Sequence, residues 1–268
     1  MSTPATQTVV RDEKIHIGID MKRNIKRIAQ RVGHTALVLI FALLLILQTA
    51  QAATYYLDAV NGDDANPGTS ELPCKTLNRA YTWYSGAGPK VQEGDTVLFR
   101  NGNYGTFRKH TNDSAAYLFY RNNWITYKAD VGHNPILNSI SIQNADKWGE
   151  IVHGRSYLRF DGFRILNGVG ITYTSYAQVR NCNITGPTEP YEGLYAPYVR
   201  PTEGIHVVYG HYITIENNEI SYVYRGIGAT GVTDNATIRN NVIYRIGEDG
   251  IVAINLDIIW LYYTKGRS

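Results

Sequence analysis

Apolar and polar residues alternate with a period of two in "ITIENNEI", residues 213–220, which is the pattern of half-buried β-strands. Ile213, Ile215 and Ile220 take the positions that face one side, and β-branched residues of this kind favour strands. The polar residues between them point to the other side: Thr214, Glu216 and Glu219. The segment therefore predicts two short strands with a common buried face.

Nearly the same text recurs, as "VRNCNITG" from residue 179, "IENNEISYVYRGIG" from 215 and "IRNNVIYRIGEDGI" from 238. One isoleucine anchors each copy, and a weaker copy precedes them: Ile165, Ile184, Ile220 and Ile243. These anchors are 19, 36 and 23 residues apart, so one unit carries an insertion. Each copy then reaches a second anchor: Ile171, Ile205, Ile227 and Ile251. A period of about twenty residues with short strands and no helical pattern predicts the coils of a parallel β-helix.

The paired asparagines predict a tight bend between successive strands, because asparagine tolerates left-handed backbone angles and can hydrogen-bond to its own turn. Asn217 and Asn218 form one pair, and Asn240 and Asn241 form the next. With Asn181 one coil earlier, we expect these amides to stack as a ladder along the solenoid. Turn chemistry accounts for them, so we assign them no catalytic role.

A solenoid needs an end cap, because its first coil otherwise exposes apolar surface and unpaired strand edges. The segment "TLNRAYTWYS", residues 76–85, places apolar side chains on one helical face and predicts a short capping helix. We therefore expect the cap and first strands in residues 53–110 and the β-helix coils in residues 111–255. Residues 256–268 lose the repeat and predict an irregular tail, with a final paired strand as the alternative, so we expect an incomplete solenoid.

The first 52 residues have the order of a secretory signal peptide: basic residues, the apolar run "ALVLIFALLLIL" at 36–47, and small residues up to Ala52. This run is short for a membrane span. We therefore expect cleavage after Ala52 and secretion of the chain, and an uncleaved N-terminal anchor is the alternative.

Loss of this leader removes seven of the 26 Lys and Arg residues and three of the 23 Asp and Glu residues, which leaves a net charge of −1. This charge gives no reason to expect a nucleic-acid partner, which requires a clustered basic surface. The remaining length suits one elongated domain, and we expect a monomer without membrane contact after cleavage. Cys74 and Cys182 are 108 residues apart, and we favour two buried thiols over a disulfide.

The stretch "YYLDAVNGDDANPGTSELPCKTLNRAY", followed by "EGDTVLFRNGNY", resembles the N-terminal signature of pectate lyase-like right-handed parallel β-helix proteins, in particular family 9 polysaccharide lyases and their relatives. The likeness covers residues 55–104 and extends loosely through the asparagine-rich coils to Ile251. Cys74 departs from it, since these proteins usually have an aromatic residue there. The resemblance implies an all-β fold: a right-handed parallel β-helix, or β-solenoid, with a short N-terminal capping helix.

The same resemblance implies a secreted, polysaccharide-associated protein that acts as a lyase on an acidic, uronate-containing glycan. Such lyases remove the proton beside a uronate carboxylate with a basic side chain, usually lysine, while calcium held by aspartates neutralises the carboxylate. Here Asp161, Asp234 and Asp249 fall at different places in the repeat, and the only lysine after Lys147 is Lys265. A non-catalytic glycan-binding or cell-surface β-helix protein is therefore one alternative. A glycoside hydrolase with two carboxylates facing one cleft is another.

The acidic segment "DAVNGDDANPG" contains Asp58, Asp63 and Asp64, which raises the question of a calcium site. It lacks the spacing and the final glutamate of an EF-hand. Its Asn, Asp, Pro and Gly residues predict a surface turn instead.

The insertion "TGPTEPYEGLYAPYVRPTEG", residues 185–204, predicts a structured loop, because its prolines resist extension of a strand. Tyr191, Tyr195 and Tyr198 lie three or four residues apart within it. Sugar rings stack on aromatic side chains, so these tyrosines are candidate substrate-binding residues at the wall of a glycan cleft. Packing of the same rings against the solenoid surface is an equally good interpretation.

The insertion leads into "EGIHVV", residues 203–208. If Ile205 and Val207 face inward, His206 faces outward, onto the face where proteins of the resembling family bind polysaccharide. Glu203 lies at the entrance of this strand. We therefore take Glu203 and His206 as candidate substrate-binding residues, and His206 also as a candidate catalytic residue.

Charged residues occupy related places in the next coils. Arg225 precedes Gly-Ile one coil later, and Glu248 and Asp249 precede Gly-Ile in the coil after that. Stacking of the coils predicts that these residues and Glu203 share one edge, about 5 Å apart per coil. Arg225 is thus a second candidate for catalysis and substrate binding, and Glu248 and Asp249 are candidate calcium ligands. An ordinary turn ladder of alternating charge explains the pattern too and is favoured, because such surface pairs are common and weak.

Overall fold

The computed structural model describes residues 26–27, 29–31, 52–81, 91–109, 122–143, 154–186, 203–231, 233–253, 259–262 and 265–267. The chain divides into two units, Met1–Gln51 and Ala52–Ser268. The described residues of the first unit are helical. Within the described residues, no helix has both the length and the apolar character needed to cross a membrane. Two predicted features lie outside the described residues: the apolar leader run at 36–47 and the three loop tyrosines, Tyr191, Tyr195 and Tyr198.

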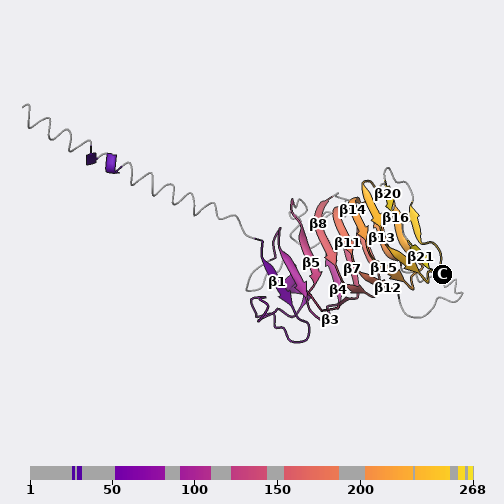
Figure 1. The fold of residues 1–268 in the computed structure, drawn as a ribbon, viewed down its shortest axis with the longest axis horizontal. Coiled ribbons are helices and arrows are strands. Elements are labelled where there is room, and N and C mark those ends of the chain that lie inside the picture. Colours follow the sequence, from indigo (N-terminus) through magenta and orange to yellow (C-terminus); the bar gives the residue numbers. More distant parts are fainter. Residues whose placement is uncertain are drawn as a thin grey trace, which may run out of the picture. The chain divides into compact units, whose positions relative to one another are not determined.

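Three parallel sheets make up the second unit, and each coil adds one strand to each sheet (Figure 1). In their described strands, sheet A consists of β1 (Thr54–Leu57), β2 (Thr96–Phe99), β5 (Ile125–Ala129), β8 (Gly154–Asp161), β11 (Thr174–Arg180), β14 (His211–Glu216), β17 (Ala236–Arg239) and β20 (Ile259–Tyr262). Sheet B consists of β3 (Gly102–Asn103), β6 (Pro135–Leu137), β9 (Arg164–Ile165), β12 (Asn183–Thr185), β15 (Glu219–Ser221), β18 (Val242–Tyr244) and β21 (Lys265–Arg267). Sheet C consists of β4 (Thr106–Lys109), β7 (Ser139–Gln143), β10 (Val169–Thr172), β13 (Glu203–Val208), β16 (Arg225–Thr230) and β19 (Ile251–Ala253).

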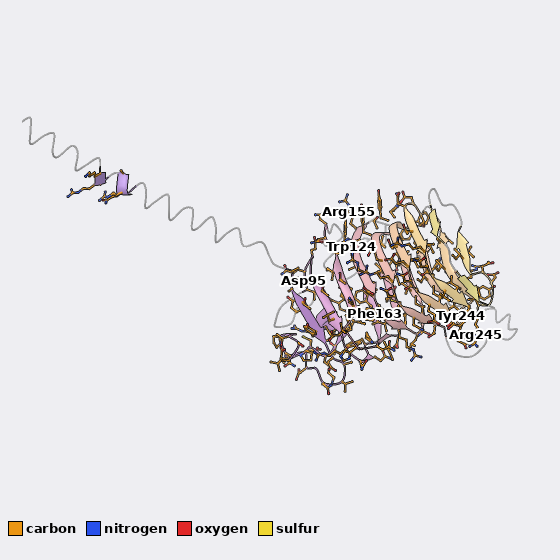
Figure 2. All side chains as sticks on the ribbon, in the orientation of Figure 1. Asp95, Trp124, Arg155, Phe163, Tyr244 and Arg245 are labelled. Carbon is orange, nitrogen blue, oxygen red and sulfur yellow. The ribbon has the colours of Figure 1, made fainter. Side chains whose placement is uncertain are left out.

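The interior is built from rows of buried side chains that run from coil to coil. One row in sheet A has aromatic side chains in its second and third members and aliphatic ones at the others: Val97, Tyr127, Phe160, Val179, Ile215 and Ile238. Phe163 is fully buried, whereas Arg155 of β8 projects into solvent (Figure 2). Burial of such rows is the main force that holds short parallel strands together, because each strand alone buries too little apolar surface to be stable.

The first set of anchor isoleucines forms a row of sheet B, as the repeat predicted: Ile165, Ile184, Ile220 and Ile243. The register predicted for the second set of anchors is wrong at one residue. Ile205, Ile227 and Ile251 are in register, but their partner one coil earlier is Val169, and Ile171 is paired with Val207. Both residues of β10 face inward, and the sequence period alone does not distinguish which of two inward residues pairs with the next coil.

The asparagine bends are confirmed, since the backbone φ angles of Asn181, Asn217 and Asn240 are 54°, 56° and 54°. The ladder, however, uses the second residue of each pair. Asn218 donates from Nδ2 to Oδ1 of Asn241 over 3.0 Å and accepts the N–H of Cys182 over 3.0 Å. Cys182 therefore takes the ladder position that we expected for Asn181.

Asn181 instead binds Asp161 over 2.7 Å. Both cysteines are free and buried, as predicted. Burial raises the pKa of the Cys182 thiol to about 12, which keeps the thiol protonated at neutral pH.

The predicted capping helix at 76–85 is a single 3₁₀ turn in the described residues, η1 (Leu77–Ala80). The next residue, Tyr81, is extended and ends the turn. Leu77 and Ala80 are buried against the solenoid, so the segment does cover the first coils. In the tail, two described stretches form the paired strands that were the alternative to an irregular tail, because β20 pairs with β17 and β21 pairs with β18. Sheets A and B thus continue through residues that no longer show the repeated sequence pattern.

The acidic segment forms the predicted turn. Asp58 Oδ1 accepts the N–H groups of Val60 and Asn61 over 3.0 and 2.9 Å. Asp64 accepts two N–H groups and a hydroxyl group, from Lys75 and Thr76, over 2.9, 2.8 and 2.5 Å. These carboxylates serve as local hydrogen-bond acceptors for the backbone.

Candidate functional site

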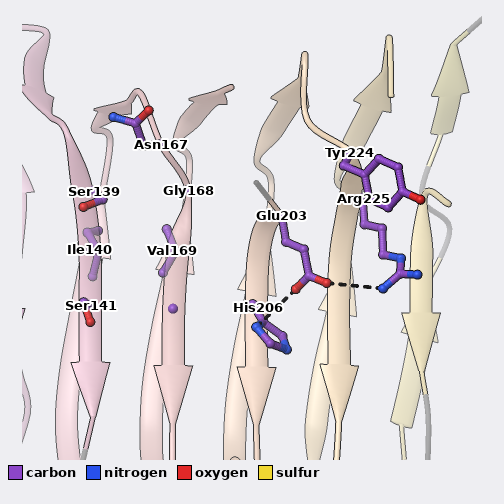
Figure 3. Close-up of a pocket in the computed structure, with 11 residues that line it drawn as sticks. Ser139, Ile140, Ser141, Asn167, Gly168, Val169, Glu203, His206, Tyr224 and Arg225 are labelled. Carbon is purple, nitrogen blue, oxygen red and sulfur yellow. Dashed lines mark ion pairs between the residues drawn. The ribbon is translucent and has the colours of Figure 1, made fainter. Parts of the chain in front are cut away.

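A cleft of about 480 Å³ lies on the outer face of sheet C, across β7, β10, β13 and β16 (Figure 3). It is lined by hydroxyl, amide and charged side chains together with exposed backbone: Ser139, Ile140, Ser141, Asn167, Gly168, Val169, Gly170, Glu203, His206, Tyr224 and Arg225. The cleft therefore crosses neighbouring coils and follows the axis of the solenoid.

The alternation of "EGIHVV" places His206 at this face. Ile205 and Val207 are fully buried, while the side chain of His206 is 42% exposed. Its partners in register on the two neighbouring strands are glycines, Gly170 and Gly228. A row with glycine on both sides of the histidine leaves the floor of the cleft open.

The space beside these two glycines differs. A Cβ atom added to Gly170 would have no heavy atom within 4 Å. A Cβ atom added to Gly228 would lie 2.9 Å from Glu203 Oε2. Gly170 thus provides free space in the cleft, and Gly228 provides the space that the Glu203 carboxylate occupies.

Arg225 lies between two carboxylates. Its Nε is 2.6 Å from Glu248 Oε2, and its Nη1 is 3.6 Å from Glu203 Oε1. The hydrogen bond to Glu248 raises the pKa of Arg225, against the small opposing effect of burial. The side chains of Arg225 and Glu248 are about one third exposed, so solvent screens this pair. The structure thus brings Glu203, Arg225 and Glu248 together, as the stacking of the coils predicted.

Glu203 Oε2 is buried, and no group among the described residues donates a hydrogen bond to it. The Nδ1 atom of His206 is 3.2 Å away, which is an ion-pair distance, but its direction does not form a hydrogen bond. On the opposite side of the ring, His206 Nε2 is 3.4 Å from the hydroxyl oxygen of Thr230. A buried carboxylate oxygen without a donor costs free energy, about 1–3 kcal/mol or more for a charged group, and such atoms call for an explanation.

Asp249 joins this edge only through its backbone, because its carbonyl accepts the N–H of Gly226 over 3.0 Å while its side chain is exposed. The contacts of Glu248 and Asp249 therefore do not support the calcium site that we expected from the sequence. Calcium takes six to eight oxygen ligands, roughly, whereas Glu203 and Glu248 both face Arg225. Within the described residues, no group of three or more His, Cys, Asp and Glu side chains is arranged to hold a metal ion.

Several lining residues were not anticipated from the sequence. Ser139, Ser141 and Gly170 stand at outward positions of β7 and β10, beside the buried Ile140 and Ile142. Ser141 and Gly170 are in register with His206 through the stacked strands. The alternation in "SISIQ" and "VGIT" carries this signal. Those coils lack the paired asparagines that mark the repeat, so the sequence alone does not align them with the later coils.

A family model described as "Right handed beta helix region" matches residues 118–259, which is more than half of the chain. The chain belongs to the right-handed β-helix family. The parallel sheets and the stacked coils agree with this membership. No curated protein matches the sequence.

Two solved structures are similar to the chain at low sequence identity. A pectate lyase, Pel9A, is 15% identical, with a TM-score of 0.45 over 75% of this chain and 56% of that one. A GH136 lacto-N-biosidase from Eubacterium ramulus is 12% identical, with a TM-score of 0.43 over 79% of this chain and 56% of that one. The chain therefore spans little more than half the length of each.

Proposed function

We propose that this β-helix protein binds a polysaccharide in the cleft of sheet C, with Glu203 and His206 at the centre of the binding site. The observation that carries the proposal is the buried Oε2 atom of Glu203, a residue that lines the cleft, because this atom has no hydrogen-bond donor among the described residues. A ligand hydroxyl group would supply that donor, because an ionised carboxylate accepts hydrogen bonds only.

The shape and lining of the cleft support a saccharide. Neighbouring strands lie about 4.8 Å apart, which is close to the length of one sugar unit, so a glycan chain along the solenoid axis meets an equivalent position in each coil. Ser141, His206 and Thr230 present polar groups along this path, and the ring of Tyr224 lines the same cleft. Sugars bind through such combinations of hydroxyl contacts and aromatic surface.

A uronate lyase, the activity that the sequence resemblance implied, needs a group that neutralises the uronate carboxylate. Arg225 is already opposed by Glu203 and Glu248, and the described residues supply no calcium site. We therefore propose binding as the function of this cleft. Secretion, indicated by the leader, is part of the proposal, since extracellular polysaccharide is then accessible.

Gly170→Val tests the site directly, because a side chain at Gly170 meets open space and has no strained backbone angle. The variant should fold normally and should lose at least about tenfold in affinity for a polysaccharide that the wild type retains in affinity gel electrophoresis, since tenfold corresponds to about 1.4 kcal/mol. Thr172→Val is the matched control, because Thr172 is the next outward position of β10 and does not line the cleft.

Equal retention of glycans by Gly170→Val and the wild type would refute the site. The ultraviolet absorbance of unsaturated sugar ends should stay flat when the protein is incubated with pectate. A sustained rise in that absorbance, lost in His206→Ala, would show that the protein is a lyase instead.

A further inference from the structure

The charges around the cleft are unbalanced. Of the described residues that line it, Arg225 is the only lysine or arginine. Three carboxylates surround this cation: Glu203 and Glu248 contact it, and Asp249 is exposed on the neighbouring coil. The edge therefore carries a net charge of −2 when His206 is neutral and −1 when His206 is protonated.

Arg225 has little capacity left for an anionic ligand. Its Nε already donates to Glu248 over 2.6 Å, and its Nη1 faces Glu203. An incoming carboxylate would lie next to these two like charges. Like charges within such distances repel, and the repulsion is stronger in a partly desolvated cleft than in water.

Arg108 is the other cation in the same row of sheet C. Its position is in register with Ser141, Gly170 and His206, three strands away from the histidine. Three strand spacings are about 14 Å, which exceeds the Debye length of about 8 Å at physiological ionic strength. Arg108 therefore does not offset the negative charge around Glu203.

The Oε2 atom of Glu203, which accepts no hydrogen bond from the described residues, also disfavours a carboxylate ligand. This buried atom requires a donor, and a sugar hydroxyl group is one. A uronate carboxylate is an acceptor and would face another acceptor across the cleft. Both the charge and the hydrogen-bonding capacity of the cleft thus disfavour a carboxylate at this position.

We infer, on the basis of the proposed polysaccharide-binding function, that the cleft binds uncharged saccharides in preference to polyuronates. The sequence resemblance implied an acidic glycan. The contacts of Arg225 and Glu203 indicate a hydroxyl-rich, uncharged one.

Pectate and its highly methyl-esterified form provide a matched pair of probes, because they share a backbone and differ in carboxylate charge. Affinity electrophoresis of the wild-type chain, in the presence of chelator, should show at least threefold tighter retention by the esterified polymer. The difference should shrink as salt is raised, because screening weakens the repulsion. Glu248→Gln, which removes one carboxylate from Arg225, should raise the ratio of pectate affinity to ester affinity by about three- to tenfold.

The outcomes separate this inference from the proposed function. Tighter retention by pectate than by its ester, with chelator or with added calcium, would overturn the charge selection and leave the binding site in place. Retention by neither polymer, nor by other neutral glycans such as galactan or β-glucan, would refute the binding function itself. An unchanged affinity ratio in Glu248→Gln would show that Arg225 is not the group that sets the selection.

Discussion

The N-terminal turn and the cleft both contain carboxylates, and they differ in how the oxygens of those carboxylates are used. In the N-terminal turn, both oxygens of Asp64 accept hydrogen bonds, from two N–H groups and one hydroxyl group. In the cleft, Oε2 of Glu203 is buried and accepts none within the described residues. The turn is complete without a ligand, whereas the cleft is not, so the state of each oxygen is a better guide to function here than the presence of a carboxylate.

The largest expected effect is on the turn. Asp64→Ala removes the acceptor of three hydrogen bonds, and the two from Thr76 are partly buried. We expect a loss of about 2–3 kcal/mol in the free energy of unfolding, measured by urea denaturation. Asp63→Ala is the matched control, since the exposed carboxylate of Asp63 accepts one hydrogen bond, from the N–H of Ala65, and its loss should cost about 1 kcal/mol or less. Equal losses in the two variants would contradict the structural role of Asp64.

Acid should also destabilise the turn, because it protonates Asp64. Burial alone would raise the pKa of Asp64, but the hydrogen bonds from Thr76 and Lys75 outweigh it and hold the pKa below the ordinary value of 3.8. A lowered pKa in the folded state means that the stabilisation is complete above the unfolded value and is lost as pH falls through the folded one. The urea concentration at the unfolding midpoint of the wild type should therefore decrease as the pH falls below about 4.

Asp64→Asn provides the comparison, because its side chain does not titrate. Its urea midpoint should fall less steeply over the same acid range than that of the wild type. Parallel curves for the two proteins would show that other carboxyl groups dominate acid unfolding.

The smallest expected effect on stability is in the cleft. Glu203→Gln removes a charge that has one buried oxygen without a hydrogen-bond donor, and it weakens the contacts with Arg225 at 3.6 Å and with His206 at 3.2 Å. These two changes oppose each other, so the free energy of unfolding should change by less than about 1 kcal/mol. Thermal or urea denaturation measures this, and a loss of more than about 2 kcal/mol would make Glu203 a structural residue like Asp64.

The same substitution should nevertheless weaken polysaccharide retention. Glu203→Gln keeps the size of the side chain and replaces its charged acceptor by a weaker one, so we expect a loss of about three- to tenfold in affinity. Unchanged retention together with unchanged stability would remove Glu203 from the site and leave its buried oxygen without a role.

Much of the fold was predictable because it is encoded locally. Alternation with a period of two identifies the inward residues, and asparagine marks the bends where φ is positive, as at Asn217 and Asn240. The outward position of His206 and the alignment of Glu203, Arg225 and Glu248 followed from the same two rules. The fold class and part of the site could therefore be read from the chain without its coordinates.

Register between coils was not predictable in this way. Val169 rather than Ile171 pairs with Ile205, and Cys182 rather than Asn181 continues the asparagine ladder. Both choices satisfy the same local pattern, and only the packing of neighbouring coils, with its requirement that buried N–H groups find acceptors, distinguishes them.

The sequence alone determined the repeat, the inward faces and the bends, because each depends on residues a few positions apart. The tertiary structure decided which coils' residues meet, and so decided that Arg225 is held between two carboxylates and that Glu203 Oε2 has no donor. These properties arise between residues 22 to 45 positions apart in the chain, Glu203, Arg225 and Glu248. Whether these charged groups pair with one another or leave an oxygen without a donor depends on distances of a few ångströms. The stacking of the coils sets those distances, and the local sequence does not.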